Sequence, residues 1–367
     1  MSIYIFILLY LILVISIVKN KRVQRISILF LIFFLAIIVG IRDGIGTDFE
    51  TYTYVYKRNL DILSINSFFT DISYEPFYSY IENFTKIIGQ REPTLFFLII
   101  SLITSLTFYK AMRNFRFSLI AQGWFIYFCF LFFSFQFNVI RHGVMASFVW
   151  LAFSYIPKNN IKKYVIFIIV GMMFHLSAII FLPFYWLLKV ELKRKHLFLL
   201  YLIGFISITF PFLINFINFI VLFLPNGTML TKLIYYTNDY YGDDPSYGIT
   251  LGIIIYTFIT LLVFPLNKKL EAEIYGYRIY YNSLVYAVFI SLSLNSLGVF
   301  VERTVSVMYL SLVFLLPSVI YSSYLKKLKI LLIPLFILYG VLIFSKNITS
   351  IEKTGEYQFI PYITIFK

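Results

Sequence analysis

The sequence predicts an all-α polytopic membrane protein. Hydrophobic residues fill 60% of its 367 positions and charged residues only 13%, whereas soluble domains carry about 25% charge. The apolar residues gather in long runs, and a hydrocarbon core of about 30 Å needs about 20 such residues per helix. Lysines and arginines lie in short clusters between these runs, as membrane topology requires. The net charge of +14 is therefore explained by basic loops that orient the chain in the membrane, and we expect no nucleic-acid partner.

About ten runs can serve as transmembrane helices. The first lacks a preceding basic region and a small-residue cleavage site, so we interpret it as a retained span. No long polar block divides the chain, which predicts one membrane-embedded domain over 1–367. The candidate spans are 2–18, 26–41, 93–109, 118–135, 138–156, 197–224, 249–266, 279–300, 304–324 and 330–344.

The segment 164–188 is interrupted by Gly171, His175 and Pro183, and we predict a bent or re-entrant helical hairpin. With this hairpin, the short inside loops hold 20 of the 31 lysines and arginines, which satisfies the positive-inside rule. Non-helical backbone at that depth needs protein or a water-filled cavity around it, so His175 should border an outer-face cavity. Both termini then lie outside. The outer segments are the large loop 42–92 with an amphipathic helix at 74–88, the loop 225–248 and the tail 345–367.

Three helix ends bring an arginine to this outer face: Arg42, Arg141 and Arg303. Arginines at span ends can simply snorkel to the headgroups, but outer-face arginines run against the positive-inside bias. Asn138, Arg141, His142 and Met145 share one predicted helical face. A guanidinium matches phosphate oxygens bidentately, so these arginines are candidate ligands of a lipid diphosphate.

Carboxylates and histidines supply candidate acid–base groups. Asp48 follows Gly44 and Gly46 in "RDGIGTD" and is the first candidate base, although it can equally cap a helix. His175 is either a core histidine or a polar group of the cavity, and Glu302 is a third candidate. Asp43 can pair with Arg42. The acidic loop 235–247 reads best as a solvated loop, and neither a cofactor motif nor a cysteine metal cluster is present, since Cys129 is the single cysteine.

Six motifs occur in a characteristic order. They are "GIRDGIGTDFETY", "YEPFY", "FNVIRHGVMASF", "MFHLSAIIFLPFY", "ERTVSVMYLSLVFLLP" and a terminal "IPY". Together they resemble the EpsG-like branch of the Wzy polymerases, which act on O-antigen, capsule and exopolysaccharide repeat units. His142 departs from the pattern, since the family often has glutamine there.

This resemblance implies a GT-C-like glycosyltransferase in the bacterial inner or plasma membrane. It would transfer the growing glycan from undecaprenyl diphosphate to a sugar hydroxyl of the next lipid-linked repeat unit, with inversion and without a metal or other cofactor. Its partners would be the lipid-linked oligosaccharide, the bilayer, a chain-length regulator and a flippase. The expected catalytic residues are Asp48, His175 and Glu302, with Arg42, Arg141 and Arg303 on the diphosphate. Further substrate contacts are expected from Asp43, Tyr52, Glu75, Asn138, His142 and Tyr309.

Two rivals stay open at this point. One is another outer-face glycan transferase, such as a ligase that moves the polymer to a terminal acceptor. The other is a flippase for the same lipid-linked oligosaccharide. A flippase needs polar groups on both sides of the midplane, and the one-sided grouping of the candidates favours an enzyme.

Overall fold

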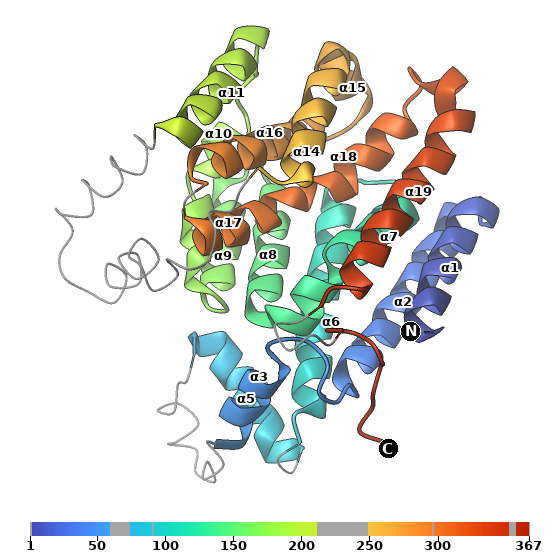
Figure 1. Ribbon diagram of the computed structural model, residues 1–367, viewed down its shortest axis with the longest axis vertical. Coiled ribbons are helices and arrows are strands. Elements are labelled where there is room, and N and C mark those ends of the chain that lie inside the picture. Colours follow the sequence, from blue (N-terminus) through green and yellow to red (C-terminus); the bar gives the residue numbers. More distant parts are fainter. Residues whose placement is uncertain are drawn as a thin grey trace, which may run out of the picture. The chain divides into compact units, whose positions relative to one another are not determined.

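The computed structural model describes residues 2–58, 74–89, 92–210, 249–295, 297–351 and 357–366. The chain forms two compact units, Met1–Tyr185 with Leu316–Lys367 (unit 1) and Trp186–Leu315 (unit 2). The regular structure of the described residues is helical, and pairing between extended segments is limited to isolated bridges (Figure 1). The predicted outer loop 225–248 and the acidic cluster at 235–247 lie outside the described residues.

The helices of unit 1 are α1 (Ser2–Ile17), α2 (Lys21–Gly40), α3 (Phe49–Arg58), α5 (Pro76–Ile88), α6 (Thr94–Asn114), α7 (Ile120–Phe130), α8 (Ile140–Phe153), α9 (Ile161–Met172) and α19 (Lys329–Ile348). Those of unit 2 are α11 (Arg194–Thr209), α14 (Leu251–Val263), α15 (Asn267–Glu273), α16 (Tyr277–Ser293) and α17 (Gly298–Tyr309). Two further helices, α10 (Phe184–Leu187) and α18 (Ser311–Ile320), include the boundaries between the units.

Five helical segments of the described chain are long and apolar enough to cross a membrane: Lys21–Gly40, Thr94–Asn114, Leu251–Glu273, Val301–Ile320 and Lys326–Ile348. The protein is therefore an all-helical, multi-pass membrane protein. Three more apolar helices, α1, α7 and α8, are shorter. The predicted count of about ten spans stays a prediction, because several predicted runs are divided between shorter helices.

The predicted spans 118–135 and 138–156 show how a run is divided. The helix α7 ends at Phe130, a short π-helical segment covers Ser134–Asn138, and α8 begins at Ile140. Asn138 therefore precedes α8, and the single helical face predicted for Asn138 through Met145 is interrupted at Val139. In unit 2 the run 279–300 ends earlier than predicted, since α16 stops at Ser293.

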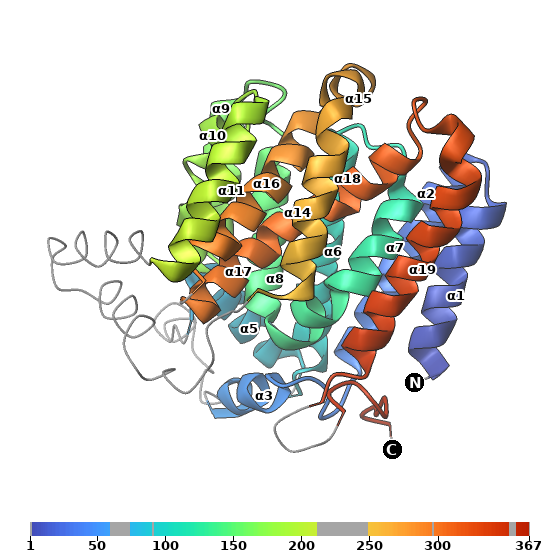
Figure 2. The same cartoon turned by 45° about the horizontal axis from the view of Figure 1, so that its top comes forward.

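In unit 1, α6 packs between α2 and α8, and α9 packs on α8. Two views place α19 beside α7 (Figures 1 and 2), and the two helices are in contact. Gly340 permits this approach, since a Cβ there would collide with the ring of Phe125. The side chain of Asn347 also donates to the backbone carbonyl of Cys129, at 2.8 Å. In unit 2, α16 is the common partner of α11, α14 and α17.

The bend predicted within 164–188 is confirmed. The helix α9 ends at Met172, and the chain then turns at His175 into a 3₁₀ segment, Leu176–Phe181. The segment returns alongside α9, because the Tyr164 hydroxyl donates to the carbonyl of Phe181 at 2.5 Å. The rings of Tyr164 and Tyr185 also meet, with centroids 5.1 Å apart.

Candidate functional site

The loop after α2 is shaped by its glycines and by the C-terminal tail. Gly44 and Gly46 both have positive φ angles, of 64° and 98°. The amide of Asp43 donates to the carbonyl of Ile363, and the amide of Gly46 donates to that of Gln358. The loop after α2 is therefore paired with the C-terminal tail in unit 1.

Gly46 makes the close backbone approach that its sequence suggested, but the approach is to the protein itself. A Cβ at Gly46 would lie 2.8 Å from both the Phe137 carbonyl oxygen and Asn138 Oδ1. Asn138 Oδ1 accepts a hydrogen bond of 3.0 Å from the amide of Thr47. Asn138 thus holds the loop against the π-helical segment. The sequence had instead predicted that Asn138 contacts the substrate.

Arg42 lies in the core of unit 1. Its side chain is 1% exposed, and its Nη1 donates to the carbonyl of Gln136 at 2.6 Å. The guanidinium carbon is 4.7 Å from the ring centroids of both Phe97 and Phe137, so aromatic faces surround the charge. Burial lowers the pKa of Arg42 to about 10, which still leaves it charged at neutral pH. This arrangement orders the loop around Arg42.

Arg141 stands at the first turn of α8 and pairs with a distant carboxylate. Its Nη1 lies 2.7 Å from Glu75 Oε2, and the two side chains are 23% and 20% exposed. The guanidinium carbon lies 4.0 Å from the ring centroid of Tyr74 and 5.8 Å from that of Tyr78. Its Nε is buried and has no hydrogen-bond partner among the described residues. The guanidinium therefore has one buried donor that the described residues leave unpaired.

Glu75 links this cation to the hairpin. Its Oε1 accepts a hydrogen bond of 3.2 Å from the amide of Leu176, directly after the bend. The amide of Phe77 also donates to the carbonyl of Met173, at 3.0 Å. The start of α5 is thus fixed to the tip of the hairpin, which brings His175 to the same cluster.

Two histidines adjoin each other here. The ring centroids of His142 and His175 are 5.6 Å apart, nearly perpendicular. His142 is 3% exposed, whereas His175 is partly exposed. Nδ1 of His175 accepts from the amide of Ser177 at 3.3 Å and lies 2.7 Å from its hydroxyl. A neutral His175 therefore carries its proton on Nε2 and can donate from that atom.

Asp48 and Tyr52 complete this part of the site. The amide of Tyr52 donates to the carbonyl of Asp48 at 3.0 Å, so the two residues lie one turn apart at the start of α3. Burial raises the pKa of Tyr52 to about 12, Arg141 opposes the rise, and Asp48 adds to it. Tyr52 is a neutral hydroxyl at pH 7, within electrostatic reach of both charges. Asp48 is partly exposed, and its Oδ1 accepts weakly from the Thr47 hydroxyl, at 3.4 Å.

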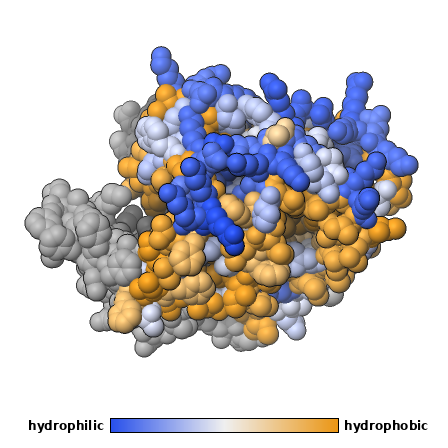
Figure 3. Space-filling view, turned by 90° about the horizontal axis from the view of Figure 1, so that it is seen from above, coloured by the Kyte–Doolittle hydropathy of each residue, from blue (hydrophilic) through white to orange (hydrophobic). Residues whose placement is uncertain are grey.

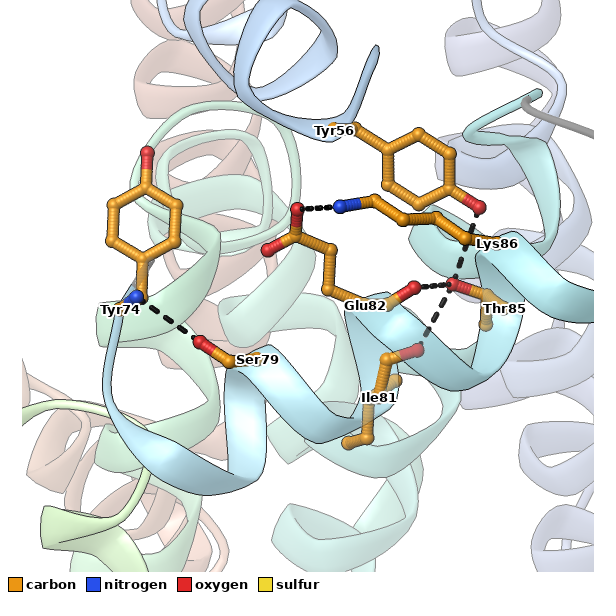
Figure 4. A network of polar contacts seen from close by, with 7 residues as sticks. All are labelled: Tyr56, Tyr74, Ser79, Ile81, Glu82, Thr85 and Lys86. Carbon is orange, nitrogen blue, oxygen red and sulfur yellow. Dashed lines mark hydrogen bonds and ion pairs between the residues drawn. The ribbon is translucent and has the colours of Figure 1, made fainter. Parts of the chain in front are cut away.

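A second polar cluster between α3 and α5 escaped sequence reasoning (Figure 4). Lys86 Nζ lies 2.6 Å from Glu82 Oε1, with both side chains at most 5% exposed. The same ammonium lies 5.1 Å from the ring centroid of Tyr56, and the Tyr56 hydroxyl donates to Thr85 Oγ1 at 3.4 Å. The i, i+4 spacing of Glu82 and Lys86 was a visible signal, but the sequence does not show that this face of α5 is buried.

The remaining candidates belong to unit 2. Glu302 is exposed and Arg303 is partly exposed, both in the first half of α17. The Tyr309 hydroxyl lies 3.2 Å from Ser291 Oγ, and its ring centroid is 4.6 Å from that of Tyr256.

The structure thus brings together Arg141, Glu75, Tyr52, Asp48, His142 and His175 in unit 1, with Arg42, Asp43 and Asn138 in the adjoining loop and segment. Within the described chain, no three His, Cys, Asp or Glu residues are grouped as metal ligands.

Comparison with known proteins gives one match. The model of the EpsG family matches residues 25–364, which is nearly the whole chain. Neither the curated proteins nor the solved structures include a match to this sequence.

Proposed function

Because the chain belongs to the EpsG family, we propose that it is a membrane-bound polysaccharide polymerase. Its substrates are oligosaccharide repeat units linked to undecaprenyl diphosphate, and it works on the outer face of the bacterial inner or plasma membrane. The family membership, the multi-pass helical chain and the polar cluster around Arg141 support this proposal. A span count of about ten and a GT-C-like architecture, with both termini outside, belong to the same proposal.

The proposed reaction is a single displacement at the anomeric carbon of the growing chain. A hydroxyl oxygen of the incoming repeat unit forms the new glycosidic bond, and its proton passes to a base. The bond between the anomeric carbon and the diphosphate oxygen breaks, and undecaprenyl diphosphate leaves with the bonding electron pair. One in-line displacement inverts the anomeric configuration, because no covalent intermediate intervenes.

Arg141 carries the leaving-group role in this proposal, and its geometry is the single observation that supports it most. A partly exposed guanidinium lies beside tyrosine rings, pairs with one carboxylate and has one buried donor without a partner among the described residues. A diphosphate oxygen can accept from the guanidinium as Glu75 Oε2 does, and a diphosphate carries more negative charge than a carboxylate. In a water-poor cleft such a preorganised cation stabilises the charge that develops on the leaving oxygen. The neutral Tyr52 hydroxyl adds a hydrogen-bond donor.

Asp48 fits the base better than His175 does. Its carboxylate is partly exposed and, among the described residues, accepts one long side-chain hydrogen bond, so it has lone pairs for a hydroxyl proton. The Nδ1 lone pair of His175 already accepts from Ser177, which leaves an Nε2–H donor. We assign His175 to hydrogen bonding with the substrate. Acid–base and diphosphate-binding roles for Glu302 and Arg303 of α17 stay predictions from the sequence, and Arg42 acts by ordering the loop that carries Asp48.

The test uses the purified full chain and a synthetic undecaprenyl-diphosphate repeat unit, without nucleotide and in the presence of a chelator. A ladder of longer oligosaccharides is the expected product. Arg141→Lys keeps the charge but loses the planar fork, so we expect a rate at least about tenfold lower, whereas Arg113→Lys, at the end of α6, serves as a matched control. Transfer of a preformed polymer to a different acceptor without a ladder would identify a ligase. Translocation across vesicles without new glycosidic bonds would identify a flippase and refute the proposal.

A further inference from the structure

Unit 2 contains two adjoining cavities of opposite chemistry. An apolar groove of about 780 Å³ runs between α11 and α14, and a basic pocket of about 500 Å³ lies between the start of α11, α15 and the start of α16. Both volumes lie within the range of about 300–1,000 Å³ that is usual for small-molecule sites. Arg194, Phe264 and Pro265 line both cavities, so they are continuous at this point.

The groove has a fixed floor and open apolar walls. Its floor is held by Tyr201, whose hydroxyl lies 2.5 Å from Thr260 Oγ1 and so ties α11 to α14. Phe198, Leu202 and Phe205 of α11 line the groove and are at least 41% exposed. Both helices pack on α16, which keeps them apart by a fixed spacing. The groove therefore offers a preformed apolar surface parallel to membrane helices.

The pocket carries an excess of positive charge. Its lining includes five lysines and arginines but only two glutamates. Arg278 is already committed, since its Nη2 lies 2.7 Å from Glu271 Oε1 and its Nη1 donates to the Lys189 carbonyl at 3.0 Å. Within the described chain, Lys193, Arg194 and Lys268 form no ion pair. Figure 3 shows hydrophilic residues gathered on the face where α11 begins and α15 lies, with hydrophobic residues at its border.

We propose that these two cavities form one binding site for an anionic glycerophospholipid, with an acyl chain in the groove and the phosphate beside Arg194 in the basic pocket. The order of the chemistry along the groove matches such a molecule, because the apolar walls end where the free cations begin. Basic pockets between membrane helices on the cytoplasmic side favour anionic headgroups, and the loops that supply these cations are those that the sequence places inside. The site shares no residue with the cluster around Arg141 and does not depend on the proposed polymerisation.

The experiment measures lipid retention by the detergent-solubilised full chain in native mass spectrometry. Phosphatidylglycerol and phosphatidylcholine with identical acyl chains are titrated in turn. We expect phosphatidylglycerol to bind at least about tenfold more tightly, with a preference that shrinks as salt is added. The double variant Arg194→Gln/Lys268→Gln should lose this preference, whereas the matched control Lys195→Gln/Lys327→Gln, which removes two exposed cations outside both cavities, should keep it.

Four results would overturn the proposal. Equal retention of the two lipids by the natural chain would show that the site does not select an anionic headgroup. An unchanged preference in the Arg194/Lys268 variant would show that the headgroup binds elsewhere. Full displacement of the lipid by millimolar glycerol 1-phosphate would reveal a site for a free phosphate. A polyprenyl monophosphate that displaces phosphatidylglycerol at far lower concentration would replace the glycerolipid as occupant. Weaker binding in Leu202→Ser/Phe205→Ser, with soluble glycerol phosphate without effect, would instead support the groove as the tail site.

Discussion

At the scale of single residues, His175 is held by the turn that it begins. Its Nδ1 accepts from the amide of Ser177, two residues further along the chain. This bond satisfies a backbone donor at the start of a 3₁₀ segment and fixes the ring orientation. The imidazole consequently presents Nε2–H. Glu75, which contacts the residue after His175, is the anionic partner of Arg141.

This tautomer is directly measurable. In protein labelled with ¹⁵N-histidine, we expect the His175 resonances to report a protonated Nε2 and an unprotonated Nδ1 at neutral pH. The bond to the Ser177 amide requires a lone pair on Nδ1, which is the physical reason. Comparison with His175→Gln assigns the signals. A proton on Nδ1 would contradict the geometry and restore His175 as a candidate base through Nε2.

The sequence identified several candidate site residues, but it did not predict which of them contact each other. The sequence singled out Arg141 by its place at a helix end, His175 by its place in an interrupted apolar run, and Glu75 through the family resemblance. Arg141 and Glu75 are nevertheless separated by 66 positions. Their contact depends on how α5 docks on the hairpin, which no local pattern encodes. Arg42 illustrates the converse. A charged residue next to a span is expected at the surface, yet aromatic packing leaves Arg42 only 1% exposed.

At the scale of elements, α5 buries its polar face and exposes its apolar face. Glu82, Asn83 and Lys86 are buried, whereas Phe84 and Ile87 are 50% and 63% exposed. The amphipathic period was predicted, together with a location along the membrane interface. Lipid tails are as apolar as a protein core, so a hydrophobic stripe does not reveal which side faces the protein.

The buried pair of α5 yields a stability prediction. Glu82→Leu leaves the Lys86 ammonium buried without its carboxylate, and we expect a loss of about 3–5 kcal/mol in unfolding free energy. The double variant Glu82→Leu/Lys86→Met removes both charges and should recover most of that loss, since apolar replacements of a buried pair are often neutral. Thermal unfolding of the purified variants in one detergent gives the order. A double variant less stable than Glu82→Leu would refute this account.

At the scale of the whole molecule, the sequence predicted the helical membrane class and the interruption at 164–188. It was less successful with helix ends, because the runs 118–135 and 138–156 meet at a π-helical segment, Ser134–Asn138, that hydropathy does not register. The two-unit division also lies beyond hydropathy, since it depends on which helices pack together. Composition indicates that the chain resides in a membrane, whereas side-chain shape decides which helices pack together.

The proposed orientation can be tested with single cysteines, because Cys129 is buried and is the single native cysteine. We expect Glu50→Cys, on the exposed side of α3, to react with a membrane-impermeant maleimide in intact spheroplasts. Lys158→Cys, in the exposed turn before α9, should react only after permeabilisation. The positive-inside rule is the reason, since Lys158 belongs to a basic loop and Glu50 to an acidic one. The reverse pattern would invert the whole topology.

The pairing of the tail with the loop after α2 has a consequence for biosynthesis. The Tyr362 hydroxyl donates to the Ile38 carbonyl, across 324 positions, and the Ile365 amide donates to Ile41. Translation proceeds at roughly 5–20 residues per second, so the loop leaves the ribosome many seconds before the strand-like segment that fixes it. A half-made chain already inserted in the bilayer therefore holds Asp48 on an unfinished loop. The pairing between these distant segments therefore forms late in translation, after the helices between them have been made.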